Sequence, residues 1–321
     1  MISIGFNMMM YENVSNPKWL IVGDYGSKYG VSNDGINWFA ATAPFSGARC
    51  VGHNGSMWVI GGNGTLAYSY NGINWTTVSS PIETQINHIA WNGTMWVAVG
   101  QGWSRNSIMY SYDGINWTCV GNGIFYFAKG IAWNGTMWVA GGSNSSGTTT
   151  LASSSDGINW TNLNITLQPG LITSVAWNGT MWVAGGMTST GGQTLLTSPD
   201  GINWTGRGSV IGATINAIVW NGSIWVAGGN DGWQGGYAFA TSSNGINWTS
   251  NTNGNFFKTG CSSLFWNGSM FVAGGTDGAG GKTLAYSLNG TTWNDLGNSI
   301  FYTFCLGVCC KKAPNLYPPR L

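Results

Sequence analysis

Short runs of β-prone residues, each ended by a turn signal, organise this chain. Asn-Gly or Asp-Gly between two such runs is the strongest short-range indication of a hairpin. In the stretch 86–118 this pattern occurs twice, at Asn92-Gly93 and at Asp113-Gly114. The stretch therefore predicts four short antiparallel strands, at 89–91, 94–98, 108–112 and 115–118.

The first hairpin also predicts how its sheet is buried. A two-residue turn at Asn92-Gly93, with positive φ at both positions, would place Trp91 opposite Thr94 and Ile89 opposite Trp96. Side chains alternate between the two faces of a strand. One face then carries Ile89, Trp91, Trp96 and Ala98, and the other carries Ala90, Met95 and Val97. Because both faces are apolar, we expect the sheet to lie between two neighbouring sheets.

One phrase recurs seven times, and its spacing predicts a repeat architecture. Successive copies start 37 to 45 residues apart, a period typical of solenoids and propellers. The copies read Asp-Gly-Ile-Asn-Trp at 34–38, 113–117, 156–160 and 200–204, Asn-Gly-Ile-Asn-Trp at 71–75 and 244–248, and Asn-Gly-Thr-Thr-Trp at 289–293.

Four-stranded sheets that are apolar on both faces and repeat seven times predict an all-β fold, a seven-bladed β-propeller of four-stranded antiparallel blades. A β-sandwich does not explain the regular period, and an open solenoid would need polar capping repeats. We expect one domain over 1–321, with blades at roughly 11–45, 46–84, 85–126, 127–170, 171–213, 214–258 and 259–300.

The ring is predicted to be closed by a terminal strand at about 301–311. This apolar segment follows the last copy of the phrase and is similar to 124–133, which leads into the first strand of a blade. The N-terminal run 2–11 is the alternative closing strand, and the sequence does not decide between the two.

The composition of the chain limits the classes of partner that are expected. Charged residues are 7% of the chain and the net charge is +1, whereas aromatic residues are 14%, which argues against disorder. Lysines and arginines form no basic stripe, so nucleic acid is not expected as a partner. No apolar run reaches the roughly 18–20 residues that span a bilayer, and the N-terminus lacks the features of a secretory signal, so no membrane insertion is expected.

The cysteines predict packed free thiols in preference to a disulfide framework or a metal cluster. A zinc site would need closely spaced cysteine pairs with further ligands, and the chain has only two histidines. We therefore expect neither a metal nor a cofactor. The six cysteines are Cys50, Cys119, Cys261, Cys305, Cys309 and Cys310.

The segment Ser111-Tyr112-Asp113-Gly114-Ile115-Asn116-Trp117 resembles the Asp-box of sialidase-type (BNR-like) propellers, with a turn one residue shorter. The resemblance implies a propeller in which the box lies between the third and fourth strands of each blade, away from any active site. Asp and Asn exchange at the box position, which predicts a turn and not a catalytic acid.

Catalytic groups are scarce. Sialidase-like hydrolysis, the alternative function, would need three convergent arginines with a tyrosine, a glutamate and an acidic aspartate. The candidates for convergence are Arg49, Arg105 and Arg207, none of them within a family motif. His53 and His88 lie within first strands, where packed histidines are expected. The sequence thus favours a protein that is not an enzyme.

Function is expected in the loops where the repeats differ. Trp103 and Trp233 are the tryptophans outside the regular positions, and they predict either stacking on a sugar or protein, or packing back over their own blades. The predicted function is recognition or scaffolding without catalysis, with a glycan or protein bound on the face that carries these variable loops. A location on a virion or a cell surface is expected by analogy. A purely structural component of a particle is the other alternative function. Candidate ligand-binding residues are Tyr25, Trp103, Arg105, Asp231 and Trp233.

Overall fold

The structure is a computed structural model. It describes residues 14, 16–23, 26, 28–104, 106–120, 123–146, 149–165, 170–187, 192–230, 238–251, 257–276, 282–297 and 300–311. Every named element in these residues is a β-strand. The same residues contain no helix of the length and apolar character needed to cross a membrane.

Strands that follow one another in the chain pair antiparallel, and they form four-stranded sheets. One pair, Met187 with Thr214, joins two such groups into a sheet of eight strands. The groups are β1 (Trp19–Gly23), β2 (Lys28–Ser32) and β3 (Phe39–Thr42) with β28 (Cys305–Cys310); β4 (Ala48–His53), β5 (Trp58–Gly62), β6 (Thr65–Ser69) and β7 (Thr76–Ser79); β8 (Gln85–Trp91), β9 (Trp96–Gln101), β10 (Ile108–Ser111) and β11 (Thr118–Cys119); β12 (Phe127–Trp133), β13 (Trp138–Ser143), β14 (Thr149–Ser154) and β15 (Thr161–Asn162); β16 (Leu171–Trp177), β17 (Trp182–Met187), β18 (Leu195–Ser198) and β19 (Thr205–Gly206); β20 (Thr214–Trp220), β21 (Trp225–Asn230), β22 (Phe239–Ser242) and β23 (Thr249–Asn251); β24 (Gly260–Trp266), β25 (Phe271–Thr276), β26 (Leu284–Ser287) and β27 (Asn294–Gly297).

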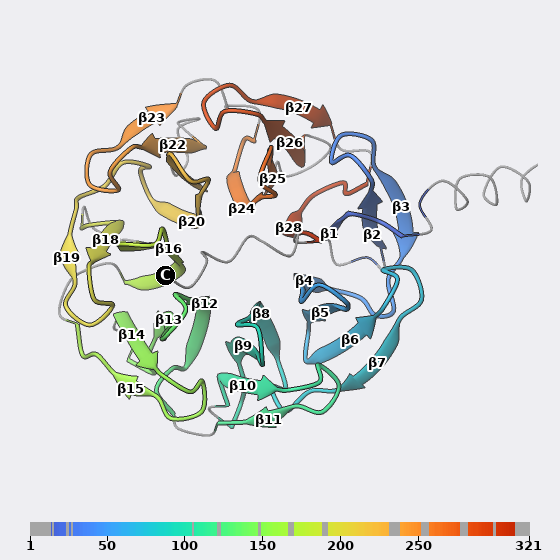
Figure 1. Cartoon of the computed structure of the whole chain (residues 1–321), viewed down its shortest axis with the longest axis horizontal. Helices are drawn as coiled ribbons and strands as arrows, with labels where there is room; N and C mark the ends of the chain where they lie inside the picture. Colours follow the sequence, from blue (N-terminus) through green and yellow to red (C-terminus); the bar gives the residue numbers. More distant parts are fainter. Residues whose placement is uncertain are drawn as a thin grey trace, which may run out of the picture.

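The sheets are arranged around a common centre (Figure 1). The strands nearest that centre, called here the inner strands, are β4, β8, β12, β16, β20, β24 and β28. Each inner strand contacts the next, and β28 contacts β4. The predicted all-β class is confirmed, and the arrangement is that of a β-propeller-like fold.

Both faces of each sheet are buried, as the apolar pattern predicted. In the sheet of β8–β11, Ile89, Trp96 and Ala98 pack with Met57 of the preceding sheet. Val97, on the other face, packs in the cluster that contains the following sheet's tryptophan Trp138. The core therefore consists of layers between neighbouring sheets, each centred on one large aromatic side chain.

The register of the first hairpin differs from the prediction by two residues. Trp91 lies opposite Trp96 and not opposite Thr94. The Asn92 side-chain oxygen accepts the amide hydrogens of Thr94 and Met95, at 2.9 and 2.8 Å. This bonding extends the turn and relieves Asn92 of the expected positive φ, which falls on Gly93 alone (106°). A shift of two residues leaves every side chain on its predicted face.

The second hairpin also has a longer turn than predicted. The fourth strand begins at Thr118, so residues 112–117 belong to the turn and not to the expected strand 115–118. Asp113 Oδ1 accepts the amide hydrogens of Ile115 and Asn116, and it receives the Ser111 hydroxyl. These bonds replace the strand ladder that the sequence pattern suggested.

The segment expected to close the ring contains β28, which pairs antiparallel with β1. The alternative closing run, 2–11, lies outside the described residues. Five of the six cysteines are buried and Cys119 is half-buried, and burial raises the pKa of the Cys310 thiol to about 12.

Candidate functional site

Of the predicted binding residues, the structure describes Trp103. Its side chain is 79% exposed in the loop between β9 and β10, so it does not pack back over its own sheet. The other four candidates, Tyr25, Arg105, Asp231 and Trp233, lie outside the described residues.

The loop that carries Trp103 is held by Glu83, which precedes β8. The Ser104 hydroxyl donates to Glu83 Oε1 at 2.7 Å. This bond, with the backbone amides of Ser104 and Trp103, keeps the pKa of Glu83 below its ordinary value. Gly102 lies so close to Glu83 that a Cβ would meet its Oε2 at 2.6 Å. The backbone next to the exposed indole is therefore tied to Glu83.

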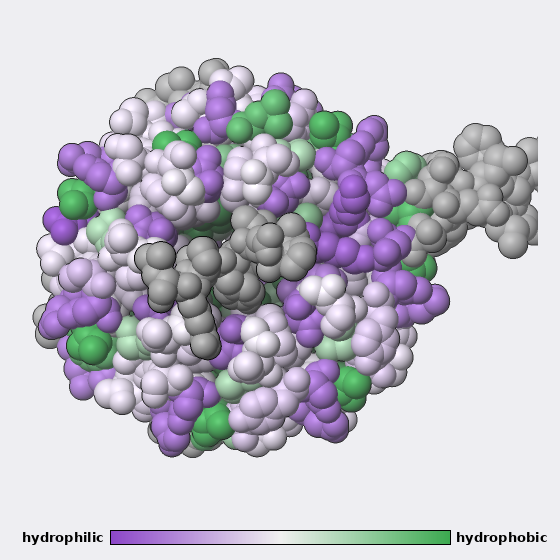
Figure 2. Space-filling view, viewed as in Figure 1, coloured by the Kyte–Doolittle hydropathy of each residue, from purple (hydrophilic) through white to green (hydrophobic). Residues whose placement is uncertain are grey.

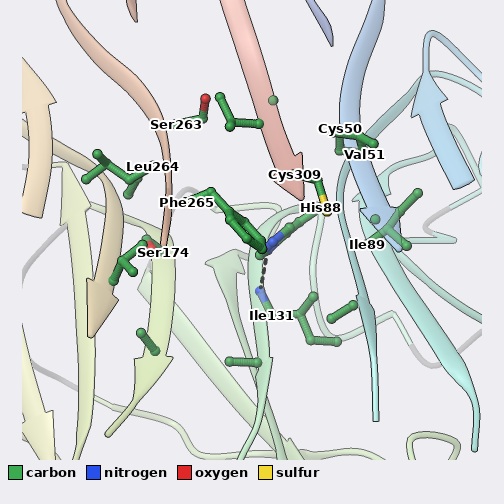
Figure 3. A pocket seen from close by; sticks show the side chains of 18 of the residues that line it. Cys50, Val51, His88, Ile89, Ile131, Ser174, Ser263, Leu264, Phe265 and Cys309 are labelled. Atoms are coloured by element: carbon green, nitrogen blue, oxygen red, sulfur yellow. Dashed lines mark hydrogen bonds between the residues drawn. The ribbon is translucent and has the colours of Figure 1, made fainter. Parts of the chain in front are cut away.

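A second candidate site is the cavity at the centre of the ring, with a volume of about 560 Å³. Its walls come from the inner strands, and Figure 3 shows side chains that line it. A cavity of this size is in the range that holds small molecules.

Each inner strand contributes one residue to this cavity through a register shift near its start. The shifted residue lies between two residues that pair normally with the neighbouring strand, and such bulges redirect a side chain. We call these seven residues the bulge ring; all of them line the cavity. They are Arg49, Asn87, Lys129, Thr173, Asn216, Ser262 and Leu306.

Three members of the bulge ring connect neighbouring sheets. Asn87 Nδ2 donates to the Ala128 carbonyl oxygen at 2.8 Å, and Asn216 Nδ2 donates to that of Cys261 at 2.9 Å. The Thr173 hydroxyl donates to the Ile215 carbonyl oxygen in the same way. These three side chains therefore have a structural role between adjacent inner strands.

Two members of the bulge ring are cations. Arg49 belongs to β4 and Lys129 to β12, on either side of β8 in the ring. Arg49 Nε donates to Asn63 Oδ1 at 3.1 Å, and Lys129 Nζ lies 5.2 Å from the centroid of the Phe127 ring. Burial lowers the pKa of Lys129, and the Arg49 charge lowers it further.

The two histidines near the cavity are neutral. Burial lowers the pKa of each to about 4. His88 Nδ1 accepts the amide hydrogen of Ile131 at 3.2 Å, drawn as the dashed line in Figure 3. His53 Nδ1 accepts the amide hydrogen of Gly55 at 3.0 Å. In each ring Nδ1 thus accepts a backbone amide hydrogen, whereas the buried His53 Nε2 has no hydrogen-bond partner among the described residues.

The opposite end of the cavity is aromatic. Tryptophans end five of the inner strands and are half-buried there. Each faces a buried aromatic residue at the start of the next strand; the Trp91 and Trp96 ring centroids are 5.2 Å apart. The cavity therefore has a polar end and an aromatic end. The five residues are Trp91, Trp133, Trp177, Trp220 and Trp266.

Two of the three arginines considered for sialidase-like binding lie in different parts of the molecule. Arg49 lines the cavity, whereas Arg207 follows the outermost strand β19 and its Nε donates to Thr197 Oγ1 at 2.8 Å. Arg105 lies outside the described residues. Across the described part of the chain there is no group of three His, Cys, Asp or Glu residues placed to hold a metal ion.

The bulge ring was not among the sequence-predicted sites. Its signal is present when the inner strands are aligned on their apolar positions, because one column then reads Arg, Asn, Lys, Thr, Asn, Ser, Leu. Such wide variation at one position of a uniform repeat indicates that the side chain there is not constrained by the apolar packing that keeps the neighbouring positions alike.

Comparison with known proteins supports the fold and goes no further. No family model matches the chain, and no curated protein matches it. Among solved structures, a computationally designed protein, Ika8, is similar with a TM-score of 0.52 and 12% identity, covering 84% of this chain and 82% of that one. A chain of a nidogen/laminin complex, a β-propeller, is similar with a TM-score of 0.52 and 11% identity, covering 75% and 94%.

Proposed function

We propose that this chain is a closed seven-bladed β-propeller. The eight-stranded sheet then counts as two blades, because a single residue pair joins its halves. The strand β28 completes the blade of β1–β3 and fastens the end of the chain to its beginning. The repeated turn supports relation to the Asp-box, since its Asp or Asn accepts backbone amides in every copy.

We further propose that the protein is a non-enzymatic recognition module that binds a glycan or a protein with the Trp103 loop. The single observation that carries this proposal is an indole 79% exposed on a loop that Glu83 holds in place. A large aromatic surface on a loop that is tied to the neighbouring segment binds sugars or protein side chains at a reduced entropic cost.

The face that would bind includes the polar end of the cavity. Gln85, at the start of β8, pairs with Gln101, which ends β9 just before the Trp103 loop. The loop and the starts of the inner strands therefore lie at one end of the ring. In Figure 2 the coloured part of the face shown is mostly polar, with scattered apolar groups.

The test is glycan-array binding by the wild type, Trp103→Ala and Tyr112→Ala. Tyr112 is also exposed, at 64%, and lies at the other end of β10, so it is a matched control. We expect Trp103→Ala to lose about tenfold or more in affinity while Tyr112→Ala binds normally. Equal binding by both variants would overturn the Trp103 site.

If no glycan on the array binds, photo-crosslinking from position 103 to candidate partner proteins tests the proposal that the Trp103 loop binds a protein. The virion or cell-surface location is proposed from the uncharged surface rich in Gly, Asn, Ser and Thr. Recovery of the chain as a stoichiometric component of a purified particle would support that location.

A further inference from the structure

Two copies of the tripeptide Asn-Gly-Thr occupy different turns of the fold. One copy, residues 92–94, lies between β8 and β9, and the other, residues 289–291, lies between β26 and β27. In both copies the asparagine Oδ1 accepts the amide hydrogens of the residues two and three positions later, at 2.9 and 2.8 Å. Each Oδ1 also accepts a hydroxyl. The two side-chain carbonyls therefore have equivalent hydrogen-bonding environments.

The two turns differ at the glycine. The Gly290 amide donates to the Ser287 hydroxyl oxygen at 2.8 Å, and Gly290 is buried, so that a Cβ on it would lie 2.7 Å from Val226 Cγ2. Gly93 is exposed, and a Cβ on it would meet nothing within 4 Å. The Gly93 amide has no acceptor in the described part of the chain. Gly93 is thus open to solvent, whereas Gly290 is enclosed.

The other repeated Asn-Gly turns divide in the same way. Between the first and second strands of a sheet the glycine is exposed, with φ of 101° to 106°, and between the third and fourth it is buried and donates to a serine hydroxyl oxygen. Asn54 is set apart, because the Gly55 amide donates to His53 Nδ1. The asparagines followed by an exposed glycine, called here the open-turn asparagines, are Asn92, Asn134, Asn178, Asn221 and Asn267. Those followed by a buried glycine, the closed-turn asparagines, are Asn71, Asn244 and Asn289.

An Asn-Gly pair carries the groups for an intramolecular acyl transfer. The glycine amide gives its proton to hydroxide, and its nitrogen forms a bond to the asparagine Cγ. The negative charge that develops on Oδ1 is stabilised by the backbone amides that already donate to it, as in an oxyanion hole. The Cγ–Nδ2 bond then breaks, ammonia leaves with a proton from water, and a cyclic succinimide remains. Water opens this ring at either carbonyl and yields aspartate or isoaspartate.

We propose that the open-turn asparagines are sites of this deamidation and that the fold protects the closed-turn asparagines. In a closed turn the glycine nitrogen must leave a buried serine hydroxyl and move against packed side chains before it can attack. In an open turn it exchanges only contacts with water. The carbonyl is polarised equally in both turns, so the accessibility of the nitrogen decides which asparagines react.

The products would gather at one end of the ring. Each open-turn asparagine directly follows one of the five tryptophans at the aromatic end of the cavity. Complete reaction would add five negative charges there, to a chain whose formal net charge is +1. Isoaspartate also lengthens the backbone of the turn and displaces the oxygen that organises it. The Trp103 loop has no part in this chemistry, so this proposal and the binding proposal can fail separately.

The experiment follows deamidation of the full chain in mildly alkaline buffer by peptide mapping with mass spectrometry. We expect Asn92 to react about tenfold or more faster than Asn289, which lies in the same tripeptide. Labelling of the products by an isoaspartyl methyltransferase identifies the succinimide route. In urea the two asparagines should react at similar rates, because the difference belongs to the fold. Similar rates in the folded protein, or a difference that persists in urea, would overturn the proposal.

A pair of serine variants tests the protection itself. Ser287→Ala frees the Gly290 amide, so Asn289 should react faster than in the wild type, although the packing around Gly290 keeps it slower than Asn92. Ser111→Ala removes the equivalent hydroxyl from another sheet, where the turn carries Asp113, and should leave the rate at Asn289 unchanged. Melting curves show that both variants are folded at the temperature of incubation. Equal rates at Asn289 in the two variants would contradict protection by the serine.

Discussion

A single side-chain oxygen organises each repeated turn. In the third copy, Asp113 Oδ1 accepts two backbone amides and a hydroxyl, and Oδ2 accepts the Asn116 side-chain amide at 2.7 Å. In the second copy, Asn71 Oδ1 accepts the same backbone amides. The exchange of Asp for Asn is therefore explained by the one oxygen that both residues share.

The carboxylates of these turns give the fold an acid-sensitive component. Partial burial alone would raise the pKa of Asp34, but hydrogen bonds from Asn37, Ile36 and Ser32 lower it to about 2. The pKa values of Asp113, Asp156 and Asp200 also lie below the ordinary value. A carboxyl whose pKa is lower in the folded state stabilises that state above about pH 4, and this contribution is lost as the pH falls toward 2.

We therefore predict that replacing Asp34, Asp113, Asp156 and Asp200 together by Asn flattens the acid limb of stability. The melting temperature of the variant should fall less than that of the wild type between pH 5 and pH 2.5. At pH 7 the variant should be equally or less stable, because Oδ2 is no longer available to the Asn side chains. Parallel curves for the two proteins would contradict this assignment.

The two turns of one sheet use glycine differently. Gly93 and Gly114 both have positive φ, at 106° and 71°. A Cβ on Gly93 would meet nothing within 4 Å, whereas one on Gly114 would lie 2.3 Å from Met57 Cε and 3.0 Å from Trp96 Nε1. The first glycine is required by backbone conformation, and the second also by the packing of neighbouring sheets.

Alanine at these positions should separate the two requirements. We predict that Gly93→Ala costs about 1–2 kcal/mol of unfolding free energy through backbone strain. Gly114→Ala should cost more, about 3 kcal/mol or above, because the methyl group also displaces Met57. Urea unfolding of both variants measures the difference. Equal losses would mean that Met57 moves aside freely.

The strands could be anticipated from the sequence, but their register could not. The turn residues and the apolar faces predicted four strands per repeat and burial on both sides. The position of Trp91 opposite Trp96 depends on Asn92 bonding its own turn, which residue type alone does not specify. The bulge ring could not be predicted for the same reason, because a residue such as Lys129 reaches the cavity through a local register shift.

At the scale of the molecule, one strand joins the two ends of the described chain. β28 pairs with β1, and its Cys305 and Val308 pack in a cluster with Trp19 and Phe301. Without β28, β1 would expose an unpaired edge and two inner strands would lose their neighbour.

We predict that a chain ending at residue 300 fails to form the compact monomer, whereas a chain ending at residue 311 forms it. Size-exclusion chromatography and near-ultraviolet circular dichroism distinguish the two. Adding a peptide of residues 301–311 to the shorter chain should restore at least part of the signal. A shorter chain that is monomeric and fully folded would show that β28 is dispensable.

The pairing of β28 with β1 also sets the order of assembly during synthesis. The ribosome synthesises β1 first and β28 last among the strands, with more than 280 residues between them, so β1 cannot pair with β28 until synthesis is nearly complete. Contacts that join such distant segments form slowly, because a long loop has to close before any of them is gained. Until translation reaches β28, the edge of β1 is unpaired and accessible to other nascent chains. Whatever shields that edge in the interval, a chaperone or rapid elongation, determines the yield of native protein.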